Sequence, residues 1–120
     1  MPEEPTGSDM RVPDSLAALI RVIHAPARLE TLAALGTLEL GVTDLADRVQ
    51  IGVTTMSHHL HRLLEAGLVE CRADRAQRLF RLSKLVVTED RGEKVLVTFK
   101  IAVPPVTLAL VRRPPLARRA

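Results

Sequence analysis

The chain has few aromatic residues and almost no cysteine. Its 120 residues include no tryptophan, no tyrosine and two phenylalanines. Proteins that bind single-stranded nucleic acid stack bases on aromatic rings, so this composition argues against that class. The one cysteine, Cys71, excludes an internal disulfide and a cysteine-rich zinc site. Apolar neighbours favour a packing role for Cys71 over redox sensing.

Segments that direct or anchor a protein in a membrane are also missing. No apolar run approaches the roughly 20 residues that a membrane span needs. The N-terminal residues lack the basic and then apolar layout of a signal peptide. We therefore expect a cytoplasmic protein with no membrane partner.

The sequence contains none of the motifs that mark common catalytic sites. It has no glycine-rich phosphate loop, no G-x-S-x-G and no carboxylate pair at a suggestive spacing. Asp44 and Asp47 fit a solvated helix start, where acidic residues complement the helix dipole. We expect neither enzymatic activity nor a cofactor.

Positive charge is unevenly distributed along the chain. The net charge is +3, but residues 72–81 contain four arginines and one acidic residue. At this length one domain is expected. We place it at residues 14–103, between a disordered N-terminal tail at 1–13 and a Pro/Arg-rich tail at 104–120.

Four segments before residue 67 show the apolar period of helices. The first runs from a cap at Asp14 or Ser15 to about His24. The second begins at Pro26, a residue favoured in first helical turns, and ends near Leu35. The positions predicted to point inward are Leu16, Leu19, Ile20, Ile23, Leu29, Leu32 and Leu35.

Residues 42–69 predict a helix, a tight turn and a second helix. Thr43 is placed to cap the first helix, and Gly52 permits the change of direction. The second helix covers about 53–66 and ends at Gly67. The residues expected to point inward are Leu45, Ala46 and Val49 on the first helix and Met56, Leu60, Leu63 and Leu64 on the second.

The outer side of the 53–66 helix carries small hydroxyl groups first and longer basic groups further along. A helix that reads the major groove of DNA needs short groups near base edges and basic groups near phosphates. The alternative is an amphipathic helix with a solvated face. His58 and His61 are spaced to reach one metal ion, with Glu65 as the best candidate for a third ligand, but the DNA interpretation uses this face.

Residues 68–82 predict a hairpin with strands at 68–72 and 77–82. A basic hairpin directly after such a helix is the arrangement called a winged helix, and its tip touches phosphates or the minor groove. A solvated strand face is the alternative for these arginines. A second hairpin is predicted over 85–101, either extending the wing sheet or contacting a second copy. The expected class is α+β: a mainly helical winged helix-turn-helix with an extra C-terminal hairpin.

Several segments resemble one family. H-A-P-A-R-L-E-T-L-A-A-L at 24–35, V-T-D-L-A at 42–46 and T-T-M-S-H-H-L-H-R-L-L-E-A-G-L-V at 54–69 are similar to helices of ArsR/SmtB-type bacterial repressors, and L-F-R-L at 79–82 resembles the end of their wing. The resemblance implies a homodimeric regulator of transcription that binds double-stranded DNA, usually a repressor released by a small-molecule or protein signal. The residues then expected at DNA are Val53, Thr54, Thr55, Ser57, His58, His61 and Arg62 on the helix and Arg72, Arg75 and Arg78 on the wing.

The chain also departs from the family pattern. Gly52 stands where members usually have a capping serine, and Val53 stands where they have a base-reading glutamine. Strands and prolines follow the wing in place of a dimerising helix. Gly41 and Thr43 occupy the positions of the family's metal-binding thiolates, so no metal is expected. The second functional hypothesis is a protein-interaction module that pairs through the 85–101 hairpin and does not bind DNA.

Overall fold

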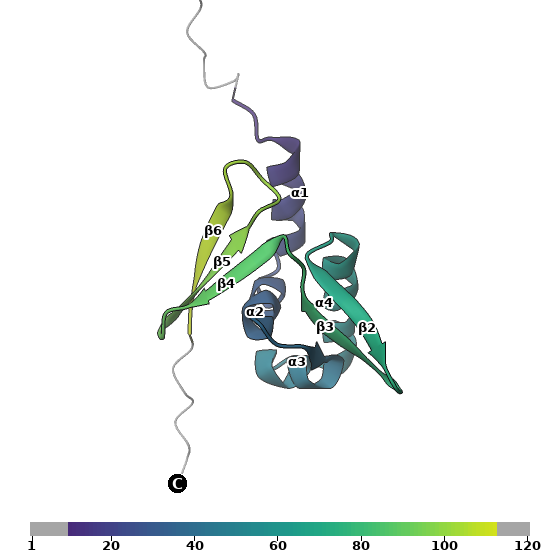
Figure 1. The fold of residues 1–120 in the computed structure, drawn as a ribbon. Coiled ribbons are helices and arrows are strands. Elements are labelled where there is room, and N and C mark those ends of the chain that lie inside the picture. The colour runs from purple at the N-terminus through teal and green to yellow at the C-terminus, as the bar shows by residue number, and fades with distance from the viewer. Residues whose placement is uncertain (1–9, 113–120) are drawn as a thin grey trace, which may run out of the picture.

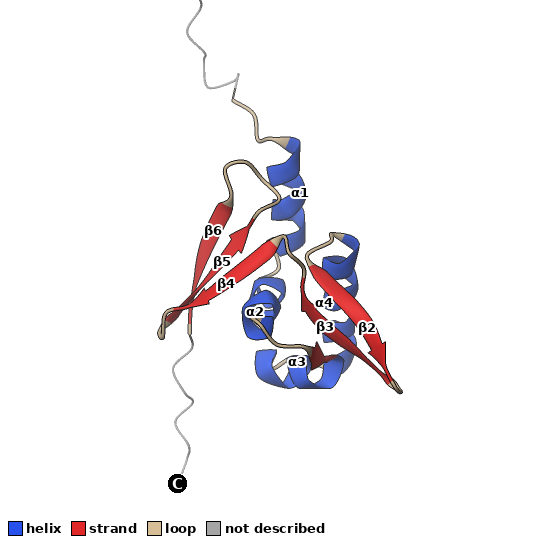
Figure 2. Ribbon diagram, in the orientation of Figure 1, coloured by secondary structure: helices blue, strands red, loops and turns tan. Residues whose placement is uncertain are grey.

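The computed structural model describes residues 10–112, in which it has four helices and six strands. The helices are α1 (Asp14–Ile23), α2 (Pro26–Leu35), α3 (Val42–Val49) and α4 (Val53–Glu65). The strands are β1 (Leu40–Gly41), β2 (Val69–Asp74), β3 (Gln77–Leu82), β4 (Val86–Asp90), β5 (Lys94–Phe99) and β6 (Val106–Val111). In Figures 1 and 2 the β2–β3 hairpin runs across α4, and the β4–β6 sheet lies on the other side of the molecule, beside α1 and α2. The predicted α+β class is confirmed.

The first two helices have the predicted extents, but the cap of α1 was predicted wrongly. Asp14 is the first helical residue and therefore lies past the cap position, and no side chain caps the helix, which follows Pro13. Ile20 is 47% exposed although the periodicity placed it inward, whereas Leu19 is buried. Pro26 occupies the first turn of α2 as expected.

The turn between α3 and α4 differs from the prediction in its backbone. Thr43 does not cap α3, because the helix begins one residue earlier, at Val42. The residue in the left-handed conformation is Gln50, at φ 62°. Gly52 has an ordinary extended backbone with φ −67° and open space around it, so this turn does not require a glycine there.

Helix α4 buries three of the four residues of its predicted stripe, leaves Leu64 partly buried against the core, and ends as predicted. Met56, Leu60 and Leu63 are at most 1% exposed. Gly67 follows the helix with φ 76°, and its N–H donates to the carbonyl of Leu64. The N–H of Leu68 donates to the carbonyl of Leu63, which completes a Schellman motif.

The wing sheet has the antiparallel order β1-β3-β2. Its hairpin turn is shorter than predicted, because only residues 75 and 76 separate Asp74 from its partner Gln77. Arg75 takes φ 56° in this turn, a conformation that usually selects glycine. Cys71 lies opposite Phe80, on the side that packs on the core.

The second sheet has the order β4-β5-β6, so the predicted second hairpin is extended by a third strand. Assigning everything from residue 104 to a tail was wrong for Val106–Val111, which form β6 along the whole of β5. The prolines at 104 and 105 lie in the connecting loop and leave the ladder intact. The remaining predicted tail residues, 1–9 and 113–120, lie outside the described part of the chain.

One core connects the helices with both sheets. Its buried members include Leu32 of α2, Leu60 of α4, Phe80 of the wing, and Val97 and Phe99 of β5. No helix within residues 10–112 has the length and apolarity needed to cross a bilayer.

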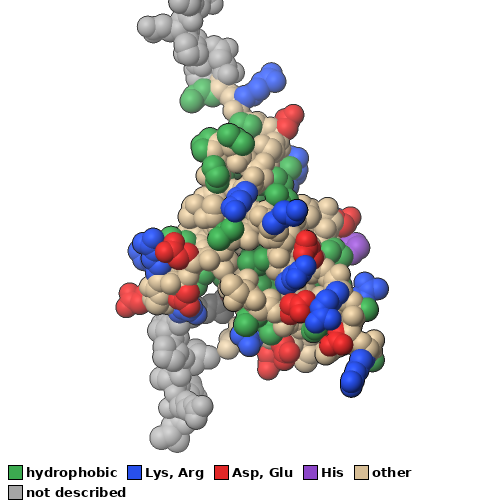
Figure 3. All heavy atoms as spheres, in the orientation of Figure 1, with side chains coloured by type: hydrophobic (Ala, Val, Ile, Leu, Met, Phe, Trp, Pro, Cys, Tyr) green, Lys and Arg blue, Asp and Glu red, His purple; other side chains and the backbone are tan. Residues whose placement is uncertain are grey.

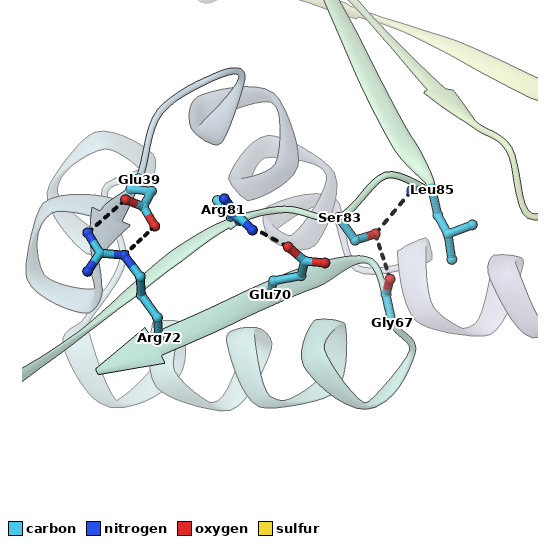
Figure 4. A network of polar contacts seen from close by, with 7 residues as sticks. All are labelled: Glu39, Gly67, Glu70, Arg72, Arg81, Ser83 and Leu85. Atoms are coloured by element: carbon cyan, nitrogen blue, oxygen red, sulfur yellow. Dashed lines mark hydrogen bonds and ion pairs between the residues drawn. The ribbon is translucent and has the colours of Figure 1, made fainter. Parts of the chain in front are cut away.

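Ser83 joins the two sheets. Figure 4 shows its hydroxyl donating to the carbonyl of Gly67, at 2.7 Å, and accepting the N–H of Leu85, at 3.2 Å. Its own N–H donates to the carbonyl of Leu68. The chain therefore leaves the wing and enters the second sheet along a path that is tied to the end of α4.

Candidate nucleic-acid interface

The outer side of α4 is exposed along its length. Val53 is 50% exposed, and the polar residues predicted to face DNA are exposed as well: Thr54, Thr55, Ser57, His58, His61 and Arg62. No side chain caps the helix at Gly52. The first N–H groups of α4 are therefore left without a side-chain partner, at the end where the helix dipole is positive.

Glu65 makes the only ion pairs of this helix face among the described residues. Its Oε1 lies 3.4 Å from Nε2 of His61 and 3.7 Å from Nη1 of Arg62. All three side chains are more than half exposed, and pairs of this kind in water are weak. Arg62 is therefore free to exchange this carboxylate for a phosphate.

His59 was predicted to be half-buried, and it is. The structure adds a partner that the sequence did not indicate: Nε of Arg28 donates to Nδ1 of His59 at 3.1 Å. Burial, then the charge of Arg28 and then that of His58, lower the pKa of His59 below 6.5. A neutral imidazole with an unprotonated Nδ1 fits this acceptor role. No spacing rule joins residues this far apart in sequence, so only the packing of α2 on α4 reveals the contact.

The wing arginines fall into two sets. On the outer face of the sheet, Arg72 makes a bidentate pair with Glu39, with 2.8 Å between Nε and Oε2 and 2.9 Å between Nη2 and Oε1 (Figure 4). Arg81 pairs with Glu70 at 3.0 Å on the same face. Figure 3 shows the resulting mixture of basic and acidic side chains over the hairpin.

The hydrogen-bonded pair of Arg72 and Glu39 shifts the pKa of both side chains. The hydrogen bond from Arg72 holds the pKa of Glu39 below 4.5, and the same bond raises the pKa of Arg72. The charge of Arg72 is thus already compensated within the protein.

Arg78 lies on the other side of β3. Side chains alternate along a strand, so Arg78 shares its side with Phe80, which packs toward α3 and α4. A groove there is lined by Ser57 and His61 of α4 together with Arg78, and Asp44 of α3 contributes one acidic group. Arg75 is exposed in the turn at the tip of the hairpin.

The structure thus divides the predicted site. It brings Ser57, His61 and Arg78 together around one groove, leaves Arg75 at the tip and engages Arg72 with Glu39 on the far face of the wing. Hydroxyl, imidazole and guanidinium groups in one groove are donors to phosphate oxygens and to base edges.

Comparison with known proteins identifies the arrangement. A family model described as a helix-turn-helix domain matches residues 22–72. The arsenical resistance operon repressor of Staphylococcus xylosus is 32% identical over 68 residues, which are 57% of this chain and 65% of that protein. The biofilm growth-associated repressor of Xylella fastidiosa strain Temecula1 is 32% identical over 71 residues, 59% of this chain and 62% of that protein. The chain thus spans less than two thirds of the length of these two relatives.

Solved structures of transcriptional regulators are also similar to this chain. The transcriptional repressor BigR of Xylella fastidiosa has a TM-score of 0.55 and 32% identity, covering 59% of this chain and 72% of that chain. The homodimeric winged helix-turn-helix DNA-binding domain of a possible ArsR-family transcriptional regulator from Mycobacterium bovis has a TM-score of 0.53 and 29% identity, covering 57% and 64%. The chain belongs to the ArsR-type winged helix-turn-helix family.

The family model covers only part of the chain. The family model ends at residue 72, within β2, and β4–β6 lie beyond it. Within residues 10–112, no three His, Cys, Asp or Glu side chains are placed to hold a metal ion. The second sheet, β4–β6, thus lies wholly outside the segment that the family model matches.

Proposed function

We propose that this protein is a transcriptional repressor that binds double-stranded DNA sequence-specifically, with α4 in the major groove and the wing on the backbone. The observation that carries the proposal is the exposed polar side of α4 beside Arg78. The repressor names of the relatives support the direction of regulation. They also support the expectation that the chain is not an enzyme.

Each part of α4 suits a different contact. The hydroxyl groups of Thr54, Thr55 and Ser57 are short enough for the helix to approach base edges closely. The uncapped N–H groups at the start of α4 suit a phosphate. Further along, Arg62 reaches the phosphates on the flank of the groove, so it contributes affinity with little sequence preference.

On the wing, we assign backbone contacts to Arg75 and Arg78. Both are exposed, and neither forms an ion pair within residues 10–112. Arg72 was predicted to contact DNA too, but breaking its bidentate pair with Glu39 would offset part of the gain. We therefore rank Arg72 below the other two.

A homodimer is part of the proposal because it explains how one short helix gains specificity. Two copies read two half-sites about one helical turn apart, which doubles the base contacts. The homodimeric Mycobacterium bovis domain supports this assembly. The alternative, strand pairing of a partner through the 85–101 hairpin, has less support: β5 is paired on both sides, so only the outer edge of β4 is left for a partner strand, and the relatives are named as repressors.

The test is a titration of mixed-sequence duplex DNA at several salt concentrations, followed by selection from a random duplex pool. Arg62→Gln is expected to weaken binding to all duplexes and to reduce the salt slope by about 1, the release of one phosphate contact. Thr54→Ala is expected to change the selected sequence rather than the salt slope.

Lys84→Gln serves as the matched control, because Lys84 is exposed but lies in the loop between the two sheets. The absence of any duplex binding at low salt would refute the proposal, since even non-specific binding persists there. An unchanged salt slope in Arg62→Gln would refute the docking of α4 in particular.

A further inference from the structure

A second hollow lies on the opposite flank of α4, between α1, α2 and the end of β5. It has a volume of about 580 Å³, within the roughly 300–1,000 Å³ typical of small-molecule sites. Its apolar wall is formed by Leu19, Val22, Ala66, Leu68 and Ile101. We call it the α1–α4 cleft; it shares no residue with the groove beside Arg78.

The polar rim of the α1–α4 cleft is strongly basic. Arg21, Arg28 and Arg62 line it together with His24 and His58, and Glu65 is the one acidic group on the rim. Glu65 already lies 3.7 Å from Arg62 and 3.4 Å from His61. Glu65 thus compensates Arg62, and the positive charges that an anion would meet without a carboxylate partner among the described residues are those of Arg21 and Arg28.

The strongest indication that the cleft binds an anion comes from Arg28. It is half-buried, and the acceptors of its hydrogen bonds are neutral: Nδ1 of His59 at 3.1 Å and the carbonyl of Val22 at 2.9 Å. No carboxylate of residues 10–112 lies within ion-pair distance of its guanidinium. A guanidinium has five N–H donors, so with two in use three remain for a ligand.

We propose that the α1–α4 cleft binds a small amphipathic organic anion, with a carboxylate or similar group on Arg28 and Arg21 and an apolar body against Leu19 and Ile101. A second copy of the chain is a poorer occupant. A two-fold contact through this face would bring the basic rim of one copy against the same basic rim of the other, so like net charges would meet.

Occupancy is expected to oppose DNA binding, a step that rests on the proposed function. His58 and Arg62 belong both to the rim of the cleft and to the outer side of α4. An anion beside them compensates charge that DNA phosphates would otherwise use. Coupling between two sites of one protein commonly changes affinity by about 5- to 150-fold, and the lower end of this range is expected.

The test uses octanoate as the probe and octanol as its uncharged counterpart, titrated into ¹⁵N-labelled protein without DNA. Octanoate is expected to shift the amides of Leu19, Ala66 and Ile101, and octanol to bind at least about fivefold more weakly, the effect of losing a charge-assisted hydrogen bond. Arg21→Gln and Arg28→Met are expected to weaken octanoate binding, and Ala18→Phe to block the cleft.

Arg21 and Ala18 are exposed residues of α1, so their variants keep the test valid if Arg28→Met unfolds. Lys84→Gln is the charge-matched control and should bind octanoate normally. Equal binding of octanol, or octanoate shifts that survive Ala18→Phe, would overturn the proposal. Cleft amide shifts that depend on protein concentration alone would assign the cleft to a second copy and overturn it as well.

Duplex affinity is then measured with and without saturating octanoate. A loss of about fivefold or more supports the coupling, and an unchanged affinity overturns it. If no duplex binds under any condition, the proposed function fails, while the titration without DNA still decides whether the cleft takes an anion.

Discussion

The two sheets of this protein have the same number of strands and the same antiparallel pairing, but they use their faces differently. In the wing sheet, β2 buries only Val69 and β3 buries only Phe80, near the base of the hairpin. In the second sheet, β5 buries Val95, Val97 and Phe99 on one side along its whole length. One sheet mainly displays charge, whereas the other mainly fills the core.

The position of each sheet in the chain accounts for this difference. β1 pairs with β3 only at Leu79 and Phe80, so the end of the hairpin beyond this contact is a two-stranded projection that lies outside the core (Figure 1). The central strand β5 packs on α2 and is flanked by β4 and β6. Burial therefore follows from the neighbours that a strand obtains, and the apolar content of the strand is adapted to them.

The largest expected effect comes from removing the core side chain of the second sheet. Phe99 is 0% exposed, and Phe99→Ala should lower the free energy of unfolding by about 3–5 kcal/mol, measured by urea denaturation. Val111→Ala, at a 71% exposed position of β6, should change it by less than about 0.5 kcal/mol. A loss below about 1 kcal/mol for Phe99→Ala would mean that the second sheet is dispensable for the core.

The next effect distinguishes the two arginine sets of the wing. Replacing Arg75 and Arg78 together by glutamine should lower duplex affinity at least about tenfold and reduce the salt slope by about 1.8, for two lost phosphate contacts. The matched double variant replaces Arg72 and Arg81, whose partners are Glu39 and Glu70. Its salt slope should remain close to that of the parent.

Equal losses in the two double variants would show that the outer face of the wing contacts DNA as well. In that case the original expectation that Arg72 contacts DNA would be restored. The outer face of the wing would then lie against the DNA backbone together with its tip.

Local periodicity was sufficient to predict the helix-turn-helix. The stripe of Met56, Leu60 and Leu63 and the glycine at position 67 specify α4 because both signals act within a few residues. The caps of α1 and α3 could not be predicted in the same way. Thr43 is compatible with capping, but where a helix begins depends on packing, and here it begins before Thr43.

Features that depend on distant partners were the ones that sequence reasoning missed. β6 was assigned to a tail because it is short and follows two prolines, and only its pairing with β5 makes it a strand. The partner of Arg72 is 33 residues away and comes beside it only when β1 joins β3. The alternation of side chains along a strand predicts which face of the sheet a residue occupies, but not whether an oppositely charged residue lies beside it on that face.

The smallest expected effect compares two carboxylates: half-buried Glu39, directly before β1, and exposed Asp90, at the end of β4. The pKa of Glu39 is held below 4.5 mainly by the hydrogen bond from Arg72. The pKa of Asp90 is held below 3.8 first by the backbone N–H of Gly92, at 2.9 Å, and then by Arg112. Since both values are lowered on folding, both carboxylates favour the folded state above their ordinary pKa values, and this contribution disappears as the pH falls through the lowered ones.

Carboxyl-carbon NMR titrations of single variants separate the two causes. Arg72→Gln should return the pKa of Glu39 most of the way to 4.5, because it removes the largest contribution. Arg112→Gln should raise the pKa of Asp90 only in part, since the N–H of Gly92 remains in the turn at φ 74°. If Asp90 instead returned fully to 3.8, its turn would be held by the side chain of Arg112, and the second sheet would resemble the wing in relying on exposed ion pairs.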